Sequence, residues 1–90
     1  MKIRVRFLLD FVNIFGQKST ELTIPPNSQL RNLVDILFDT AEKRAYIFSK
    51  NNYIKGHFLL NGVNIMGLKG LDTALKENDE VVIMPSMSGG

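Results

Sequence analysis

A stripe of apolar residues at helical spacing constrains the fold of this chain more than any other feature. The stripe consists of Leu30, Leu33, Val34, Leu37, Phe38 and Ala41. Intervals of three and four residues are typical of an amphipathic helix with one buried face, and Asn27 or Ser28 is a candidate N-cap. Burial of the large side chains contributes roughly 8–15 kcal/mol. We therefore expect a helix that ends near Arg44 or Ala45 and lies across a sheet.

Two runs before this helix show the period-two alternation of half-buried strands. The first extends from Lys2 to Leu9, and the residues that it turns inward are Ile3, Val5 and Phe7. The second, Thr20–Ile24, ends where Pro25 and Pro26 remove ladder donors. Residues 10–16 are too apolar for an exposed loop and predict a packed connection or a short helical turn. Together the two runs predict an N-terminal hairpin with a wide turn.

The second half of the chain predicts further strands. A connection over residues 46–56, with a possible short strand at 45–48, leads into His57–Leu60. This strand runs into the turn dipeptide Asn61-Gly62, because both residues tolerate positive φ. Residues 63–65 return as a short strand, and Glu80–Met84 forms the last one. The leucines expected to supply core contacts in between are Leu68, Leu71 and Leu75.

The order strand, strand, helix and then strands matches an α+β fold of the β-grasp type. In this architecture a mixed sheet of four to five strands packs on one main helix, and the first and last strands pair in parallel. Residues 1–84 are expected to form the domain, followed by a flexible tail at 85–90. Ninety residues with 44% hydrophobic and 22% charged side chains suit one small domain of this kind.

Composition excludes several classes of function. The chain has no cysteine, so it offers neither a thiolate metal site nor a cysteine nucleophile. Its alternating start lacks the continuous apolar segment of a signal peptide or a membrane span, so we expect a cytoplasmic protein without a membrane partner. A net charge of +2 is far from the concentrated basic footprint of a nucleic-acid binder.

The sequence lacks a constellation of residues typical of catalysis. His57 is the single histidine, so imidazole metal binding is not expected. Asp35 and Asp39 lie four residues apart on the expected helix and are interpreted as solvated surface, not as a general acid and base. The glycines at 62, 67 and 70 form no phosphate-binding fingerprint. We therefore expect no catalytic site within this chain.

Basic and aromatic residues interleave between positions 43 and 55. They are Lys43, Arg44, Tyr46, Phe48, Lys50, Tyr53 and Lys55. This interleaving can neutralise and stack single-stranded nucleic acid, although core aromatics flanked by solvated lysines are the favoured interpretation. An RNA-binding module remains a rival hypothesis.

Alternation in the last strand predicts an apolar patch on the outer side of the sheet. Glu80 sets the phase, because a lone carboxylate does not point into a core. The outward patch then consists of Leu8, Leu59, Val82 and Met84, bordered by Arg4 and Arg6. An exposed patch of this kind marks a partner surface. The alternative is that the connection at 46–55 covers part of it.

The last residues of the sequence form a tail that ends in two glycines. Fixing the backbone of Gly89 or Gly90 costs about 1–2 kcal/mol each, so we expect this segment to be mobile. Its reactive group is the carboxylate of Gly90, which a glycine presents to another protein's pocket with little steric hindrance.

Several motifs together resemble one protein family. Leu60-Asn61-Gly62, the run from Leu75 through Asp79-Glu80-Val81, and Pro85 to Gly90 resemble the small subunit of molybdopterin synthase. More broadly, the chain is similar to the ubiquitin-like sulfur carriers, including the thiamine-pathway carrier and the ubiquitin-related modifier. It departs from the molybdopterin branch at Asn78, where a glycine is common, and at Ser86, where a second proline is common. Asn78 is compatible, because asparagine accepts left-handed geometry.

The resemblance implies a ubiquitin-like β-grasp fold and a chemistry that partner enzymes perform. An adenylating enzyme, similar to ubiquitin-activating enzymes, would use ATP and Mg to activate the Gly90 carboxylate. A sulfur donor would then displace AMP and leave a thiocarboxylate for the molybdopterin synthase large subunit or another acceptor. Gly89 would thread a narrow channel, Pro85 would direct the exit of the tail, and the outward patch would dock the partners. Conjugation of Gly90 to lysines and tRNA thiolation are alternatives.

Overall fold

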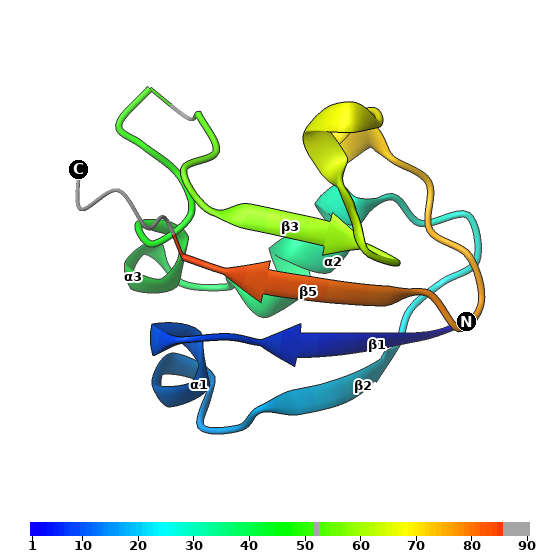
Figure 1. The fold of residues 1–90 in the computed structure, drawn as a ribbon, viewed down its shortest axis with the longest axis horizontal. Helices are drawn as coiled ribbons and strands as arrows, with labels where there is room; N and C mark the ends of the chain where they lie inside the picture. The colour runs from blue at the N-terminus through cyan, green and yellow to red at the C-terminus, as the bar shows by residue number, and fades with distance from the viewer. Residues whose placement is uncertain (52, 86–90) are drawn as a thin grey trace.

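Five strands form one mixed sheet in the order β2-β1-β5-β3-β4 (Figure 1). The computed structural model describes residues 1–51 and 53–85. The strands are β1 (Lys2–Phe7), β2 (Ser19–Thr23), β3 (His57–Leu60), β4 (Val63–Asn64) and β5 (Glu80–Met84). The central strands β1 and β5 pair in parallel, and the other pairs are antiparallel. The predicted β-grasp order and its parallel centre are confirmed.

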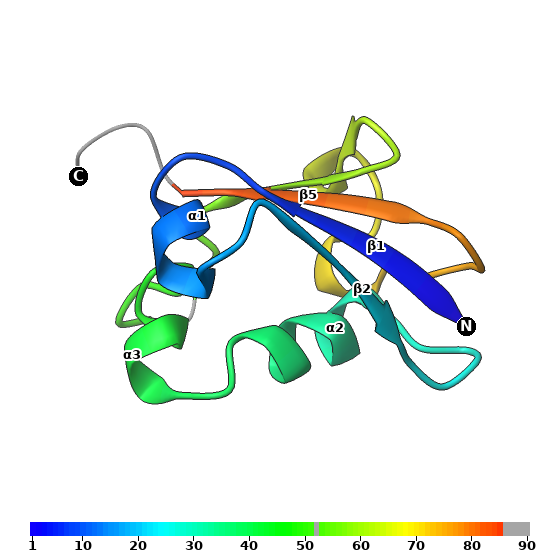
Figure 2. The same ribbon diagram turned by 90° about the horizontal axis from the view of Figure 1, so that it is seen from below.

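The helices lie on one face of this sheet, as the edge-on view shows (Figure 2). They are α1 (Asp10–Phe15), α2 (Leu30–Leu37) and α3 (Ala41–Arg44). The expectation of a single helix to Arg44 was wrong, because Phe38 leaves the helical conformation at φ −101° and ψ 68°. Thr40 then starts α3 by accepting a hydrogen bond from the Lys43 amide at 3.1 Å. Ala41 is consequently exposed, whereas Phe38 stays buried.

The cap of α2 also differs from the prediction of Asn27 or Ser28. Gln29 is the N-cap, and its backbone N–H donates to Asn32 Oδ1 at 2.8 Å. Ser28 instead donates from its hydroxyl to the carbonyl of Pro25 at 2.7 Å. Asn27 has φ 66°. Both predicted caps therefore belong to the turn after β2, and they lie two residues (Asn27) and one residue (Ser28) before the N-cap.

The core lies between the sheet and the helices. Strand alternation buries the predicted residues Ile3, Val5, Phe7, Phe58, Leu60, Val81 and Ile83, and the large side chains of the helical stripe join them. The leucine prediction holds for Leu75 and for the partly buried Leu71, but Leu68 is 44% exposed. Ile65 takes the core position instead, because the Asn64 side chain accepts from Met66 N at 2.9 Å and starts the short helix η1 (Ile65–Gly67). The strand expected at 63–65 thus ends at Asn64.

The remaining connections follow the turn chemistry of the sequence. Asn61 and Gly62 have φ angles of 50° and 86°, which confirms the predicted tight turn between β3 and β4. The strand considered for residues 45–48 is reduced to an isolated bridge between Phe48 and Ile54. A short helix, η2 (Gly70–Asp72), precedes the final strand. In the part of the chain described, no helix has the length and apolar character needed to cross a membrane.

Candidate functional site

The strand register brings the predicted outward patch together. Val82 of β5 lies opposite Arg6 of β1 and Leu59 of β3. Leu8 follows β1 and donates its amide to the carbonyl of Ile83 at 3.0 Å, which places it beside Met84. All four apolar side chains of the patch are half-buried, on the face of the sheet that the helices leave open (Figure 2).

The described residues of the connection, 45–51 and 53–56, do not extend over this patch. It turns Ile47 into the core and packs Phe48 and Ile54 against it. The edge-on view places this segment on the helix side of the sheet (Figure 2). The outward patch therefore keeps its partial exposure, with Arg4 and Arg6 exposed along its border.

Gly56 contacts the backbone at the end of β5. A Cβ atom at this glycine would lie 3.0 Å from the Met84 carbonyl oxygen and 3.5 Å from Ile47 Cγ2. This contact was not predicted from the sequence, although a glycine directly before a strand can indicate a close backbone approach. Pro85 follows Met84 and is half-buried. The predicted tail residues Gly89 and Gly90 lie outside the described residues, as do residues 86–88.

The acidic residues that begin β5 have a structural role. Asn61 Nδ2 donates to Asp79 Oδ1 at 2.8 Å, and the Glu80 amide donates to Asn61 Oδ1 at 2.9 Å. Asp79 also accepts from the Lys76 amide at 2.8 Å. Asn78 has φ 67°, which confirms that asparagine accepts left-handed geometry here. This network joins the end of β3 to the start of β5 and fixes the strand that leads to the tail.

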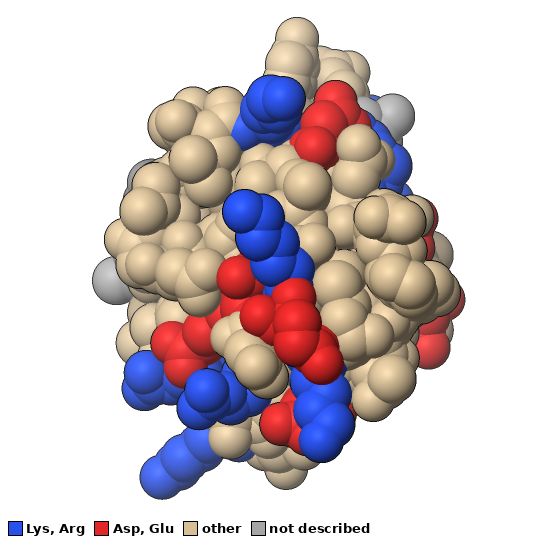
Figure 3. All heavy atoms as spheres, turned by 90° about the vertical axis from the view of Figure 1, so that its right-hand side faces the viewer, with Lys and Arg blue, Asp and Glu red and all other residues tan. Residues whose placement is uncertain are grey.

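Charged side chains at the opposite end from the tail are intermixed. Figure 3 shows acidic and basic groups side by side over this end. Within residues 1–51 and 53–85 no group of three or more His, Asp or Glu side chains could hold a metal ion. His57 is exposed on β3, opposite Met84. The other end of the sheet, where β5 finishes, instead carries the half-buried apolar patch.

Two of the cations considered for nucleic-acid binding already have partners. Arg44 pairs with Asp35 at 3.1 Å and stacks on the Phe48 ring at 4.8 Å. Lys43 pairs with Asp39 at 3.3 Å. The interpretation of the aromatics as core residues was wrong for Tyr46 and Tyr53, which are 48% and 72% exposed. Both tyrosines lie in the connection at residues 45–56. In this connection it is Ile47, and not a tyrosine, that is fully buried in the core.

The sheet order, the parallel centre and the helices on one face define a ubiquitin-like β-grasp protein. The model of the ThiS family matches residues 5–90, and the chain belongs to this family of ubiquitin-like sulfur carriers and modifiers. Carriers of this family pair with activating enzymes. Among curated proteins, the chain is similar to small archaeal modifier protein 3 of Haloferax volcanii, with 27% identity over 92 residues and all of both chains covered.

Solved structures support the same fold. A Haloferax volcanii protein determined in solution superposes with a TM-score of 0.83 and 25% identity, covering 100% of this chain and 87% of that one. A putative molybdopterin converting factor, subunit 1, from Pyrococcus furiosus superposes with a TM-score of 0.74 and 20% identity, covering 97% and 99%. The second likeness concerns the fold alone.

Proposed function

We propose that this chain is a sulfur carrier for molybdopterin synthesis and that the carboxylate of Gly90 is its reactive group. One observation carries the proposal: the central strand β5 runs directly toward the tail, and the outward patch lies beside its end. A partner that binds this patch can hold the domain while it works on the tail. Membership of the ThiS family supports the assignment.

The proposed reaction takes place in a partner enzyme. With ATP and Mg, an adenylating enzyme joins the Gly90 carboxylate to AMP and releases pyrophosphate, so that a poor leaving group becomes a good one. Hydrosulfide, or a donor equivalent to it, then attacks the carbonyl carbon. The bond from carbon to the AMP oxygen breaks, AMP leaves, and a thiocarboxylate remains. The molybdopterin synthase large subunit is the proposed acceptor, in line with the name of the Pyrococcus furiosus protein that shares the fold.

The mass of the intact protein tests this proposal. Incubation with the cognate adenylating enzyme, ATP, Mg and sulfide is expected to exchange one oxygen for sulfur at Gly90. A variant that lacks Gly89 and Gly90 serves as the control and is expected to keep its original mass. Unchanged mass of the full chain with several authentic adenylating enzymes would refute the sulfur-carrier proposal.

Docking through the outward patch has a separate test. Leu59→Arg places a charge in the centre of the patch and is expected to raise the KM of the adenylating enzyme for the carrier about tenfold. Val63→Arg is the matched control, because Val63 is 49% exposed on the neighbouring strand and is not part of the patch. Equal KM values for the two variants would exclude docking through this face.

A protein modifier is the second candidate function, and the likeness to small archaeal modifier protein 3 favours it. In this case Gly90 forms an isopeptide bond with a lysine of a target protein. Lysine-linked Gly-Gly remnants in digested cell extract would support conjugation. Transfer of sulfur from the thiocarboxylate to a molybdopterin precursor or to tRNA, with the corresponding acceptor enzyme, would distinguish the branches of the carrier function.

A further inference from the structure

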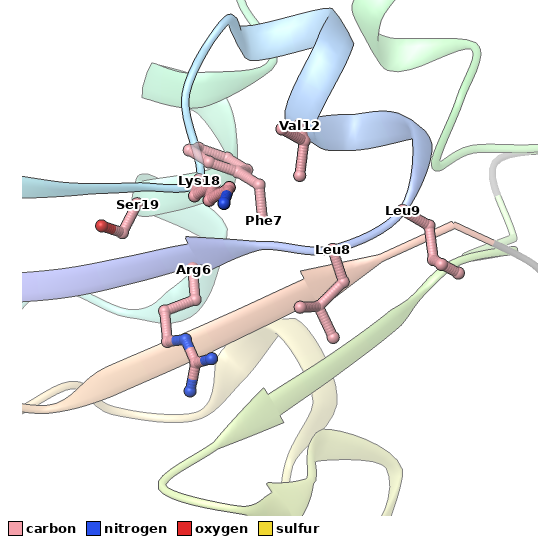
Figure 4. A pocket seen from close by; sticks show the side chains of 7 residues that line it. All are labelled: Arg6, Phe7, Leu8, Leu9, Val12, Lys18 and Ser19. Atoms are coloured by element: carbon pink, nitrogen blue, oxygen red, sulfur yellow. The ribbon is translucent and has the colours of Figure 1, made fainter.

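A groove at the end of β1 extends the outward patch toward α1 (Figure 4). Its volume is about 440 Å³, and the residues that line it are Arg6, Phe7, Leu8, Leu9, Val12, Lys18 and Ser19. Leu8 belongs to the outward patch and Arg6 borders it, so the two surfaces are continuous. Leu9 and Val12 add apolar side chains that lie beyond the predicted patch. We call this feature the Leu9 groove.

Leu9 carries two local costs to folding. Its φ of 55° and ψ of −132° match the first central position of a type II′ turn, which glycine dominates. The carbonyl of Leu8 accepts from the Phe11 amide at 3.2 Å, as this turn requires. Leu9 is also the N-cap of α1 without a side-chain hydrogen bond, a position where leucine ranks among the poorest residues. Its side chain is 53% exposed to solvent, so burial within the folded chain does little to offset these costs.

A leucine with these costs is explained by a contact outside the folded chain. Strained and exposed positions of this kind gather at functional sites, and a side chain held outward by a rigid turn needs little ordering when it enters a pocket. Figure 4 shows Leu8 and Leu9 extending from the end of β1, with Val12 coming from α1. The apolar part of the groove therefore suits an apolar side chain of a partner.

The charges of the groove specify its occupant further. Arg6 and Lys18 are exposed, and neither forms an ion pair with any carboxylate that the structure describes. The lysine and arginine residues that do form ion pairs are Lys2, Arg31, Lys43 and Arg44. Two free cations beside an apolar floor complement an apolar side chain that has a carboxylate next to it.

We propose that the Leu9 groove binds a segment of the adenylating enzyme in which an apolar side chain is flanked by an acidic residue, with Leu9 as the anchor. This inference rests on the proposed function, because it assigns part of the surface used by the same partner. It adds Leu9, Val12 and Lys18 to the docking surface. Arg6 and Lys18 orient the acidic residue, and the apolar contacts hold the segment.

The substitution Leu9→Gly tests the anchor, because stability and binding are expected to change in opposite directions. Glycine relieves the strained turn, so the midpoint of thermal unfolding is expected to rise. Loss of the side chain is expected to raise the KM of the adenylating enzyme about five- to tenfold at unchanged kcat. A purely structural leucine would instead lower stability when removed and leave KM unchanged.

Leu68→Gly is the matched control for this variant. Leu68 is 44% exposed, lies outside the groove and has a negative φ of −117°. It is expected to lose stability and keep the KM of the wild type. If the wild type is adenylated and Leu9→Gly has the same KM, the groove proposal is overturned while the carrier function stands. If the wild type is not adenylated by its cognate enzyme, the carrier function itself fails.

Charge reversal tests the acidic residue of the partner. Lys18→Glu is expected to raise KM severalfold at low salt, and the effect is expected to shrink as ionic strength rises. Lys18→Arg is expected to restore the wild-type KM. Lys69→Glu is the control, because it makes the same change in net charge away from the groove. An equal increase in KM for this control would show that net charge alone causes the effect, and would contradict the proposal.

Discussion

Among the described residues other than glycine, asparagines have the positive φ angles at the end of the sheet where β5 begins, whereas a leucine has one at the end where β5 finishes. Asn27, Asn61 and Asn78 have φ angles of 66°, 50° and 67°. Asparagine tolerates this geometry because its short polar side chain makes local hydrogen bonds. Leu9, at 55°, has a bulky side chain that gains nothing of this kind. A positive φ is therefore held by asparagine at one end and by leucine at the other, and the ψ of −132° places Leu9 in a turn position that glycine dominates.

The surroundings of these residues differ in the same sense. Asn61 uses both polar atoms of its side chain, toward Asp79 and the Glu80 amide, and intermixed charges surround this end (Figure 3). Leu9 instead lines a groove whose other lining residues include half-buried apolar groups and two cations, Arg6 and Lys18, without described partners. The difference is consistent with the proposed docking role: the asparagines suit the fold at the far end, while Leu9, near the end of β5, suits the fold poorly and lines the proposed groove.

The largest expected effect on stability comes from α1, which packs near the end of β5. Phe11 is fully buried and packs edge-on against Phe38 at 5.7 Å and Tyr46 at 6.2 Å. Phe11→Ala is expected to lower the free energy of unfolding by about 3–5 kcal/mol in urea denaturation. Ile36→Ala, on the exposed side of α2, is the control and is expected to cost about 0.5 kcal/mol or less. A small loss for Phe11→Ala would show that α1 is not needed to support this end.

Gly56→Ala tests the contact at the base of the tail. The new Cβ atom would lie 3.0 Å from the Met84 carbonyl oxygen, so the variant is expected to lose about 1–3 kcal/mol through overpacking. Gly67→Ala is the matched control, because nothing lies within 4 Å of its Cβ position. Amide chemical shifts in β5 should change with the first variant only. Equal stability of the two variants would contradict a tight contact here.

Asn61→Ala tests the hydrogen-bond network at the far end. Its removal leaves the Glu80 amide and one Asp79 oxygen without their partner, and alanine is strained at φ 50°. We expect a loss of about 1–2 kcal/mol in thermal or urea unfolding. Asn13→Ala, on the exposed side of α1, is the control. If both variants are equally stable, the network does not stabilise the far end.

The smallest expected effects on stability come from replacing a positive-φ residue by glycine at each end of the sheet. Asn78→Gly is expected to change stability by about 0.5 kcal/mol or less, because asparagine already suits its left-handed backbone. Leu9→Gly is expected to gain up to about 1 kcal/mol. Paired urea denaturation curves measure the difference. Equal effects would remove the distinction between the two ends.

Periodic features of the fold could be predicted from the sequence. The alternation in β1 and β5 identified the inward residues Val5 and Val81, and the phase set by Glu80 identified the outward residues. The Asn61-Gly62 dipeptide predicted its turn because local backbone chemistry decides such turns. The outward patch followed from these local patterns together with the β-grasp order.

Features that depend on tertiary packing could not be predicted in this way. Phe38 continues the helical period, yet the helix ends before it, and its ring packs against Phe11 and Phe15. Leu68 and Ile65 are both apolar, and only the turn started by Asn64 decides which one is buried. The Leu9 groove was missed because its evidence is a φ angle and an exposed fraction. Neither quantity follows from residue type.

The placement of β5 between β1 and β3 has a mechanical consequence. A force applied at Met84 along the strand loads the hydrogen bonds to both neighbours at once, in shear, because these bonds run across the direction of pull. A strand at the edge of the sheet would share such a force with one neighbour only. The central position of β5 therefore helps the fold to withstand a pull along this strand from its C-terminal end, as the proposed handling of the tail by a partner requires.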